Sequence, residues 1–193
     1  MSLINIRTFT GASLKTYATS MAKLRTEICK ERPFLCKATV EEETTYLRKL
    51  SEQKDAIAVL VFDGSIIVGA SIGAPFESQD PEFLKIFQEK GLNPHQFYYF
   101  GQSVLSDPYR GRGLGHHFFD IREQHVKHLK RFKSIWFLSI MPSHKHDIDP
   151  TSEISSLFSF WEKRGYIKHP DLIIHKSGNK ESSKTLMFWT KDI

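Results

Sequence analysis

One short segment of the chain, residues 110–115, concentrates three glycines and two arginines in the order Arg-Gly-Arg-Gly-Leu-Gly. An apolar run over 98–105 precedes the segment and apolar residues at helical spacing follow it, so the segment is expected to join a strand to a helix. Glycine lets a ligand approach the backbone closely, and the first N–H groups of a helix have no partner inside the helix. Together with the charges of Arg110 and Arg112, these features favour binding of a phosphate or pyrophosphate group.

Two common phosphate-binding motifs do not fit this segment. A P-loop requires lysine and then serine or threonine after its last glycine, but His116 and His117 follow Gly115. The dinucleotide-binding pattern Gly-x-Gly-x-x-Gly, started at Gly111, would require a glycine at position 116, which is a histidine. A solvated strand-to-helix connection is the plain alternative for a single loop of this composition.

A third pattern, Arg/Gln-x-x-Gly-x-Gly/Ala, is filled by Arg110, Gly113 and Gly115. Here the sequence resembles the acetyl-CoA-binding motif of the GNAT superfamily of N-acetyltransferases. A second block, Phe-Trp-Glu-Lys-Arg-Gly-Tyr over 160–166, is similar to a later helix of that family, which ends Phe-Tyr-Glu-Lys-x-Gly-Phe/Tyr. The two blocks occur in the family's order with a predicted strand between them, and this pairing favours the resemblance over a solvated turn.

Length and charge limit the class of protein. The 193 residues are expected to form one domain over 1–193. Lys and Arg outnumber Asp and Glu by 27 to 22, and the net charge of +5 suits a polyanionic cofactor without indicating nucleic acid. No signal peptide and no apolar run of membrane-spanning length is found, so a cytoplasmic protein with no membrane partner is expected.

Cysteine and histidine spacing argues against a metal site. The two cysteines, Cys29 and Cys36, are too few for a disulfide framework or a four-cysteine zinc site, and unpaired thiols are expected. The best histidine cluster, around His144, His146 and Asp147, lacks a second pair of ligands elsewhere in the chain. We therefore expect no metal cofactor.

Hydrophobic periodicity and turn signals divide the chain into strands and helices. The predicted strands cover 3–9, 56–62, 66–70, 98–105, 134–140, 172–175 and 185–190, and the predicted helices cover 14–28, 39–50, 81–90, 111–130 and 154–164. This order predicts a mixed, α+β-like α/β fold. It also resembles the GNAT fold, a mostly antiparallel twisted sheet of about six to seven strands, splayed at the acetyl-CoA slot and flanked by helices.

The predicted helix over 81–90 departs from the family, which usually has a short hairpin there. Asp80 is a candidate N-cap, Pro81 suits the first turn, and Gly91 suits the position after the last turn. Because inserted segments often carry function, the helix either covers the acceptor site or is a surface elaboration.

The resemblance implies where acetyl-CoA binds. Its pyrophosphate would lie over 110–115 and its pantetheine arm along the preceding strand, which Gly101 is expected to interrupt with a bulge. The implied cofactor-binding residues are Ser103, Val104, Leu105, Arg110, Gly111, Arg112, Gly113, Leu114, Gly115 and His116.

The implied reaction is direct transfer of the acetyl group from the thioester to an amine. An amine such as lysine, with a pKa of about 10.4, must first lose a proton, and the tetrahedral intermediate needs a donor for its oxyanion. A backbone N–H near Leu105 is the implied donor. The family's frequent tyrosine acid corresponds to Trp161, whose indole cannot supply a proton to the leaving thiolate.

No catalytic pair follows from the sequence. Gln102 stands where the family often has a carboxylate base, and it can only orient a substrate or a water molecule. Tyr98, Tyr99 and Tyr166 are weak candidates for the acid. Transfer can instead rely mainly on positioning of the two reactants.

The acceptor and the partners stay open. Arg32 and Phe34, in the connection after the first helix, are weak candidates for binding an amine acceptor, and Arg32 also fits an ordinary surface position. The sequence predicts an acetyl-CoA-dependent N-acetyltransferase acting on a small molecule or a protein, with a homodimer allowed for. The alternatives are a non-catalytic acetyl-CoA-binding module and, with less support, a nucleic-acid-associated protein.

Overall fold

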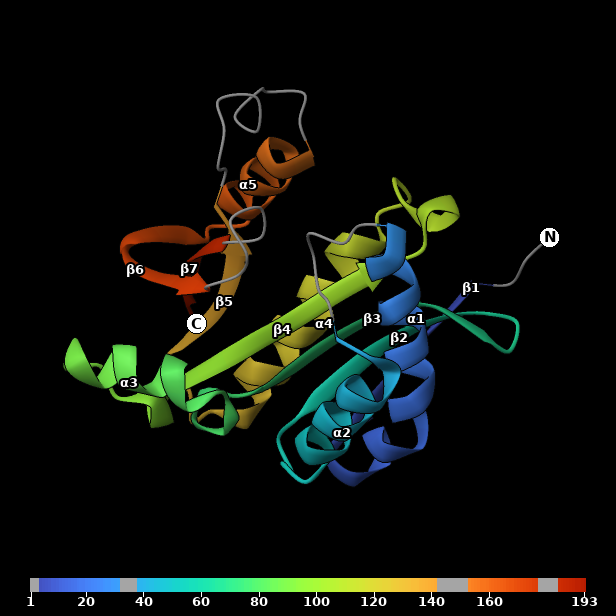
Figure 1. The fold of residues 1–193 in the computed structure, drawn as a ribbon, viewed down its shortest axis with the longest axis horizontal. Coiled ribbons are helices and arrows are strands. Elements are labelled where there is room, and N and C mark those ends of the chain that lie inside the picture. Colours follow the sequence, from blue (N-terminus) through green and yellow to red (C-terminus); the bar gives the residue numbers. More distant parts are fainter. Residues whose placement is uncertain (1–3, 32–37, 142–152, 177–183) are drawn as a thin grey trace.

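The protein was analysed as a computed structural model that describes residues 4–31, 38–141, 153–176 and 184–193. Seven strands form one sheet in the order β1-β2-β3-β4-β5-β7-β6 (Figure 1). They are β1 (Ile4–Thr10), β2 (Ile57–Asp63), β3 (Ile66–Pro75), β4 (Phe97–Leu105), β5 (Ser134–Ile140), β6 (Ile167–Lys176) and β7 (Lys184–Asp192). Neighbouring strands are antiparallel except for the parallel pair β4–β5. The mixed α/β class and the mostly antiparallel sheet are therefore confirmed.

Helices cover both faces of this sheet. They are α1 (Ala18–Glu31), α2 (Val40–Ser51), α3 (Pro81–Glu89), α4 (Leu114–Leu129) and α5 (Glu153–Lys163). α1 and α2 lie on the face turned to the viewer in Figure 1, and α4 lies behind β3 and β4. The sheet takes strands from both the N-terminal and the C-terminal parts of the chain.

Alternation along β2 shows how the two faces are built. Val59 and Val61 point into a first core, which they share with Phe118 of α4. Leu60 and Phe62 point into a second core, formed with α1 and α2. Successive side chains of a strand point to opposite faces, so a strand that is apolar throughout requires helices on both sides.

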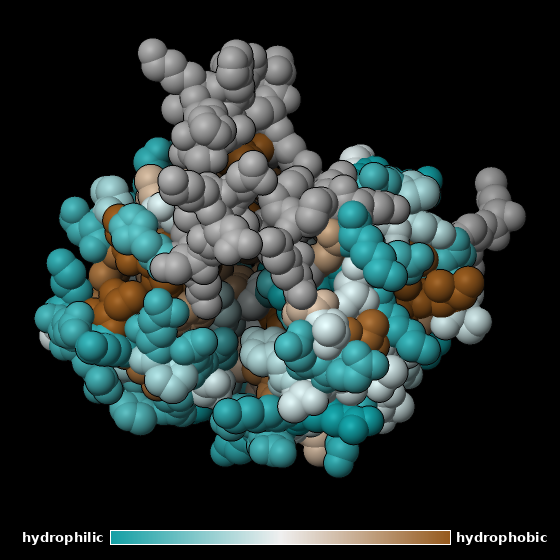
Figure 2. Space-filling model, viewed as in Figure 1, coloured by the Kyte–Doolittle hydropathy of each residue, from teal (hydrophilic) through white to brown (hydrophobic). Residues whose placement is uncertain are grey.

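A third core explains the inserted helix. α3 places Phe87, which has no exposed surface, against Phe76, Trp136 and Phe188. This core lies over β5, β7 and β6, and apolar side chains reach the surface between α3 and the β6–β7 pair (Figure 2). The predicted helix over 81–90 is thus a structural element that buries one face of the C-terminal strands.

Local signals set several element ends as predicted. Thr39 and Glu42 form a capping box, in which the Thr39 N–H donates to Glu42 (2.8 Å) and the Glu42 N–H donates to Thr39 (3.2 Å). Asp80 caps α3 by accepting the Glu82 N–H at 3.0 Å. Gly64 turns the β2–β3 hairpin with a φ of +59°.

Other predicted boundaries moved. α1 begins at Ala18 because a 3₁₀ helix, Gly11–Tyr17, precedes it, and α4 begins at Leu114 because the preceding loop is not helical. β6 extends over Ile167–Lys176, well beyond the strand predicted at 172–175.

Cys29 is disulfide-bonded, so the expectation of an unpaired thiol there is wrong; Cys36 lies outside the described residues. None of the helices among those residues is long and apolar enough to cross a membrane.

Candidate functional site

The parallel strands β4 and β5 pair only at their beginnings. Phe97 pairs with Ser134 and Tyr99 with Trp136, and no later β4–β5 pair occurs within these two described strands. β5 then continues beside β7 over its whole length, Ser134–Ile140, while β4 runs on beside β3 (Figure 1). We call this divergence beyond Tyr99 and Trp136 the fork. Among the described residues, this divergence leaves one edge of β4 beyond Tyr99 without a strand partner. An extended ligand arm can add to such an edge like a further strand.

A β-bulge in β4 accompanies the fork. Ser71 pairs with Ser103 and Gly73 with Phe100, so two residues of β4 oppose the single residue Ile72 of β3. Bulges bend a strand and increase its local twist. This confirms the bulge that the sequence predicted at position 101.

Gly101 is required at the bulge by close packing. A Cβ atom there would lie 2.7 Å from Cγ1 and 3.0 Å from Cδ1 of Ile72. Beside it, the side chain of Gln102 is exposed. The bulge therefore depends on a residue without a side chain, followed by a polar side chain at the fork.

Arg122 of α4 lies directly behind the bulge, and the sequence analysis did not single it out. Its side chain is 1% exposed, and it donates to the Ile72 carbonyl (2.8 Å) and the Gly101 carbonyl (3.4 Å). Burial lowers the pKa of Arg122 to about 10, so the guanidinium is still charged at neutral pH. The available signal was its position four residues after Phe118 and four before Val126, on the apolar stripe of the helix.

The glycine-rich loop between β4 and α4 is open on its outer side. Gly111 and Gly113 have φ angles of +72° and +78°, a conformation that strongly favours glycine. Gly113 is also the N-cap residue of α4 and makes no side-chain cap. The first N–H groups of the helix therefore face outward at its positive end.

Gly115 is the most informative of these glycines. It lies in the first turn of α4, where φ is not positive, and a Cβ atom built on it would meet no protein atom within 4 Å. Alanine would be more favourable in such a helical position by roughly 1 kcal/mol. Neither conformation nor internal packing explains glycine here, whereas close approach of a ligand to the helix end does.

Two adjacent residues, Tyr109 and Arg110, anchor the loop to the sheet. Nε of Arg110 donates to the Leu105 carbonyl at 3.2 Å and lies 3.0 Å from the Asp107 carboxylate. Tyr109 donates its hydroxyl to Asp63 of the β2–β3 hairpin at 2.5 Å, and this hydrogen bond raises the pKa of Tyr109. Arg110 thus holds the loop against β4 in addition to carrying charge.

Arg112 and His116 differ in their surroundings. Arg112 is exposed, with its guanidinium 5.5 Å from the Tyr109 ring centre. The His116 ring lies 4.8 Å from Phe160 of α5, and its Nδ1 is 3.3 Å from Arg164. His116 therefore contacts α5, while Arg112 is directed toward solvent beside the loop.

The second sequence block holds α5 and β6 against α4. The buried carboxylate of Glu123 accepts hydrogen bonds from Arg164 (3.1 Å), the Tyr166 hydroxyl (3.0 Å) and Lys191 (2.9 Å). Trp161 packs in the first core, 5.3 Å from the Trp189 ring. Burial, and then the charge of Glu123, raises the pKa of Tyr166. The hydroxyl therefore keeps its proton and its hydrogen bond to Glu123.

The four sequence-based catalytic candidates occupy different places. Tyr98 is fully buried on the α4 face, with its hydroxyl donating to the Asp55 carbonyl at 2.8 Å, and Tyr166 is 2% exposed. Tyr99 points to the opposite face, at the last residue of the β4–β5 pairing. Tyr99 is thus the last β4 residue paired with β5, and Gln102 follows on β4 beyond that pairing. The hydroxyls of Tyr98 and Tyr166 are instead hydrogen-bonded in the first core, to the Asp55 carbonyl and to Glu123.

Aromatic residues of the inserted segment border Tyr99. Its ring lies 5.8 Å from Phe76 and 6.0 Å from Phe83 of α3. Burial raises the pKa of Tyr99, and the charge of Arg25 on α1 partly opposes this shift. Arg25 itself forms an ion pair with Glu43 that joins α1 to α2.

Several residues expected at the site belong to segments that the structure does not describe. The acceptor candidates Arg32 and Phe34, and the histidine cluster at His144 and His146, lie outside the described residues. Within the parts of the chain that are described, no group of three or more His, Cys, Asp or Glu side chains could hold a metal ion.

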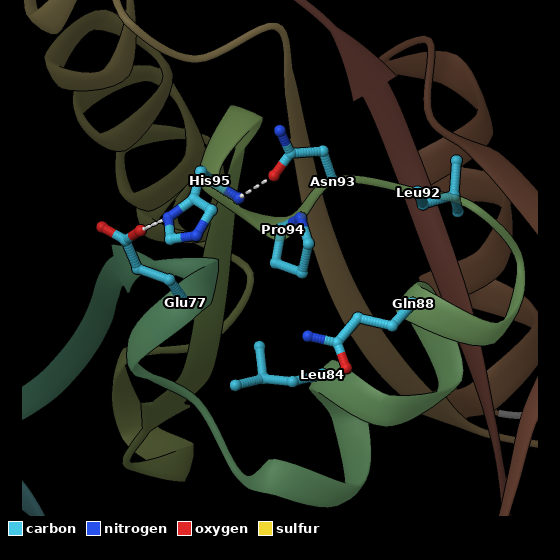
Figure 3. Close-up of a pocket in the computed structure, with 7 residues that line it drawn as sticks. All are labelled: Glu77, Leu84, Gln88, Leu92, Asn93, Pro94 and His95. Carbon is cyan, nitrogen blue, oxygen red and sulfur yellow. Dashed lines mark hydrogen bonds and ion pairs between the residues drawn. The ribbon is translucent and has the colours of Figure 1, made fainter.

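A cavity of about 370 Å³ lies at the other end of β4, beside α3. Leu84 and Gln88 line it, and Glu77 forms an ion pair with His95 (Figure 3). The backbone N–H of His95 donates to the side-chain oxygen of Asn93 at 3.1 Å. Because β4 begins near this cavity and ends at the glycine-rich loop, the cavity is separate from the fork.

No family model and no curated protein sequence matches the chain, but many solved structures do. A GNAT-family acetyltransferase from Streptococcus pneumoniae has a TM-score of 0.65 at 12% identity, over 99% of this chain and 100% of that one. A GNAT-family acetyltransferase from Staphylococcus aureus has a TM-score of 0.62 at 14% identity, over 98% and 99% of the two chains. NAA60 of Arabidopsis thaliana in complex with acetyl-CoA has a TM-score of 0.61 at 10% identity, over 99% of each chain.

These structures match the chain over nearly its whole length, 98–99% of its residues. At such low identity the shared feature is the three-dimensional arrangement. The chain therefore has the fold of the GNAT acetyltransferases.

Proposed function

We propose that this protein is an acetyl-CoA-dependent N-acetyltransferase that transfers the acetyl group directly to a primary amine of a small molecule or a protein. One observation carries the proposal: a single strand, β4, connects an unpaired edge at the fork to an open, glycine-lined helix end. An extended arm with a diphosphate at one end and a thioester at the other fits that combination. Structures of this fold include NAA60 in complex with acetyl-CoA and with a bisubstrate analogue.

The cofactor contacts follow from this placement. The outward N–H groups of 111–115 and the side chain of Arg112 would hold the phosphates, and the backbone of Ser103, Val104 and Leu105 would pair with the pantetheine arm. Gly115 supplies the room for close approach. Leu114 is buried beneath the loop and would position it, and His116 would contact the phosphates only at the margin, since its ring faces α5.

Tyr99 and Gln102 are the side chains available for chemistry at the fork. A buried phenol with a raised pKa stays protonated at neutral pH, so Tyr99 can donate a hydrogen bond to the leaving sulfur without giving up its proton. Gln102 can orient the amine or a water molecule that accepts the amine's proton. Positioning of amine and thioester supplies most of the rate in this scheme.

The main alternative is an acetyl-CoA-binding module without efficient catalysis. β4 carries no carboxylate or histidine side chain along 97–105, so no strong base faces the fork from this strand. Trp161, packed in the first core, supplies no acid. A binder of this kind would share the cofactor site and lack turnover.

The first test is calorimetric titration of acetyl-CoA into the wild type and Gly113→Glu. The glutamate adds negative charge at the helix end, so affinity should fall about tenfold or more. Gly91→Glu is the matched control, because Gly91 also has a positive φ (+69°) and open space around it but lies after α3. A thiol-release assay across a panel of amines then separates an enzyme from a binder.

The outcomes are distinct. Equal loss of affinity in Gly113→Glu and Gly91→Glu would mean that the effect is general strain. A wild type that does not bind acetyl-CoA at high micromolar concentration would overturn the cofactor site. Binding without thiol release from any amine would favour the binding module.

A further inference from the structure

The bulge in β4 removes ladder hydrogen bonds inside the protein. Ile72 has no register partner on β4, because the pairing passes from Ser71–Ser103 to Gly73–Phe100. A buried carbonyl that accepts no hydrogen bond destabilises the folded protein. The bulge therefore needs another donor for the carbonyls that the ladder leaves unpaired.

Arg122 supplies those donors from α4. Its guanidinium donates to the carbonyls of Ile72 (2.8 Å) and Gly101 (3.4 Å) and to the Ser103 hydroxyl (3.1 Å), while Nε donates to the Phe118 carbonyl (3.0 Å). These acceptors lie on both strands of the bulge and on the helix behind it. The planar guanidinium carries five N–H donors in a fixed arrangement and can bond all of these acceptors together, whereas a lysine ammonium cannot.

The charge of Arg122 is buried, and the groups that accept its hydrogen bonds are neutral carbonyls and a hydroxyl. No described carboxylate forms a salt bridge with it, because the adjacent Glu123 pairs with Arg164 and Lys191. The rings of Phe100 and Phe119 lie 4.2 and 5.0 Å from the guanidinium carbon. Burying a charge in this way is expensive for stability, so its place beside the fork suggests a task besides packing.

The orientation of one peptide unit links Arg122 to the fork. The Gly101 carbonyl and the Gln102 N–H belong to the same planar peptide and point in opposite directions. Because the carbonyl accepts from Arg122, the N–H points away from Arg122, at a residue where β4 has no β5 neighbour. A hydrogen bond to the carbonyl of a peptide also makes its N–H a better donor.

We propose that Arg122 is a positioning residue that holds the Gly101–Gln102 peptide so that the Gln102 N–H faces the fork and binds the acetyl oxygen. The proposal rests on the proposed function and replaces the donor expected near Leu105. During transfer, the amine nitrogen first adds to the acetyl carbon, and the electron pair of the C=O bond becomes negative charge on the oxygen. The C=O bond then re-forms as the C–S bond breaks, the CoA thiolate leaves, and the proton lost by the amine passes to water. A preoriented, polarised N–H stabilises that charge more than it stabilises the neutral thioester.

The test compares the wild type with Arg122→Lys and Arg122→Met. Affinities for acetyl-CoA and for CoA are measured separately, since CoA lacks only the acetyl group. The preference for acetyl-CoA over CoA should fall about fivefold to tenfold in both variants, with CoA affinity retained. Val126→Ala, which truncates a buried residue one turn further along α4, controls for loss of stability and should keep the preference.

A second readout needs no ligand. The ¹⁵N shift of the Gln102 amide in the free protein reports the hydrogen bond to the Gly101 carbonyl, so it should move in Arg122→Lys and stay in place in Val126→Ala. If Arg122→Met does not fold, Arg122→Lys carries both measurements.

Three results separate the possibilities. An unchanged Gln102 shift, or an unchanged acetyl-CoA preference in a folded variant, overturns the role of Arg122. A wild type that binds neither ligand overturns the proposed function, while the Gln102 shift still tests the contact. The ¹⁵N shift of Gln102 could change in Arg122→Lys while the wild type binds CoA and acetyl-CoA with equal affinity. That result would mean that Arg122 has a structural role only.

Discussion

Tyr98 and Tyr99 are adjacent in the chain, yet their side chains lie on opposite faces of the sheet. Tyr98 donates its hydroxyl to the Asp55 carbonyl in the first core, and Tyr99 borders Phe83 of α3 on the other face. The two hydroxyls differ in surroundings because successive side chains of a strand alternate between faces. Their roles should therefore separate in single substitutions.

Tyr99→Phe should lower kcat about tenfold, with an acceptor identified in the amine panel, and leave acetyl-CoA affinity unchanged. The lost hydroxyl would no longer donate to the leaving sulfur. Steady-state kinetics together with calorimetry measures the two effects. Tyr98→Phe should instead lower the free energy of unfolding by about 1 kcal/mol and keep kcat. Equal loss of kcat in both variants would contradict the assignment of Tyr99.

Between elements, Glu123 connects three segments that are distant in sequence. α4, the α5–β6 turn and β7 meet at its carboxylate through Arg164, Tyr166 and Lys191. The second sequence block thus has a structural role, which is to fix the C-terminal strands beside the helix that follows the glycine-rich loop. Relaxing this junction would alter the fork from the β5 side.

Titration of Tyr166 makes this junction sensitive to alkaline pH. Because its pKa is raised above 10 in the folded protein, the folded state holds its proton where the unfolded state has lost it. The stabilising effect is therefore complete below about pH 10 and declines as the pH rises further.

Tyr166→Phe should lower the free energy of unfolding at pH 8 by about 1 kcal/mol, through loss of the hydrogen bond to Glu123. Above about pH 10 the difference between wild type and variant should shrink, since only the wild type titrates there. Denaturant unfolding at pH 8, 10 and 11 measures the difference. A gap that does not change with pH would contradict the role of this phenol.

Across the entire chain, three cores share one sheet. The first and second lie on opposite faces of its N-terminal half, and the third lies under α3 over the C-terminal strands. α3 also brings Phe83 against Tyr99, so it connects the third core to the fork. α3 thus buries one face of the C-terminal strands and also contacts Tyr99.

Phe87→Ala should lower the free energy of unfolding by about 3–5 kcal/mol, because a fully buried ring is replaced by a cavity. Lys85→Ala, on the exposed side of the same helix, should change it by less than about 0.5 kcal/mol. Chemical denaturation of both variants checks this. A small effect of Phe87→Ala would mean that α3 is a dispensable surface segment.

Local chemistry made much of this protein predictable from its sequence. Three features depend only on residues close together in the sequence: the Thr39–Glu42 capping box, the Asp63-Gly64 turn, and the glycines at 111 and 113. Such features can be recognised from neighbouring residue types alone. Alternating and helical periodicities located every strand and every long helix. The spacing of Arg110, Gly113 and Gly115 then pointed to the fold.

The features that complete the site depend on contacts between distant segments. Arg122 meets Ile72 and Gly101 across the sheet, and the parallel pairing of β4 with β5 stops after Tyr99. Sequence periodicity shows that neighbouring residues face opposite sides, but not which side carries which helix. The chain's local pattern thus specified the elements and the glycine-rich loop, whereas packing between elements determined the fork, the buried arginine behind it and the different surroundings of Tyr98 and Tyr99.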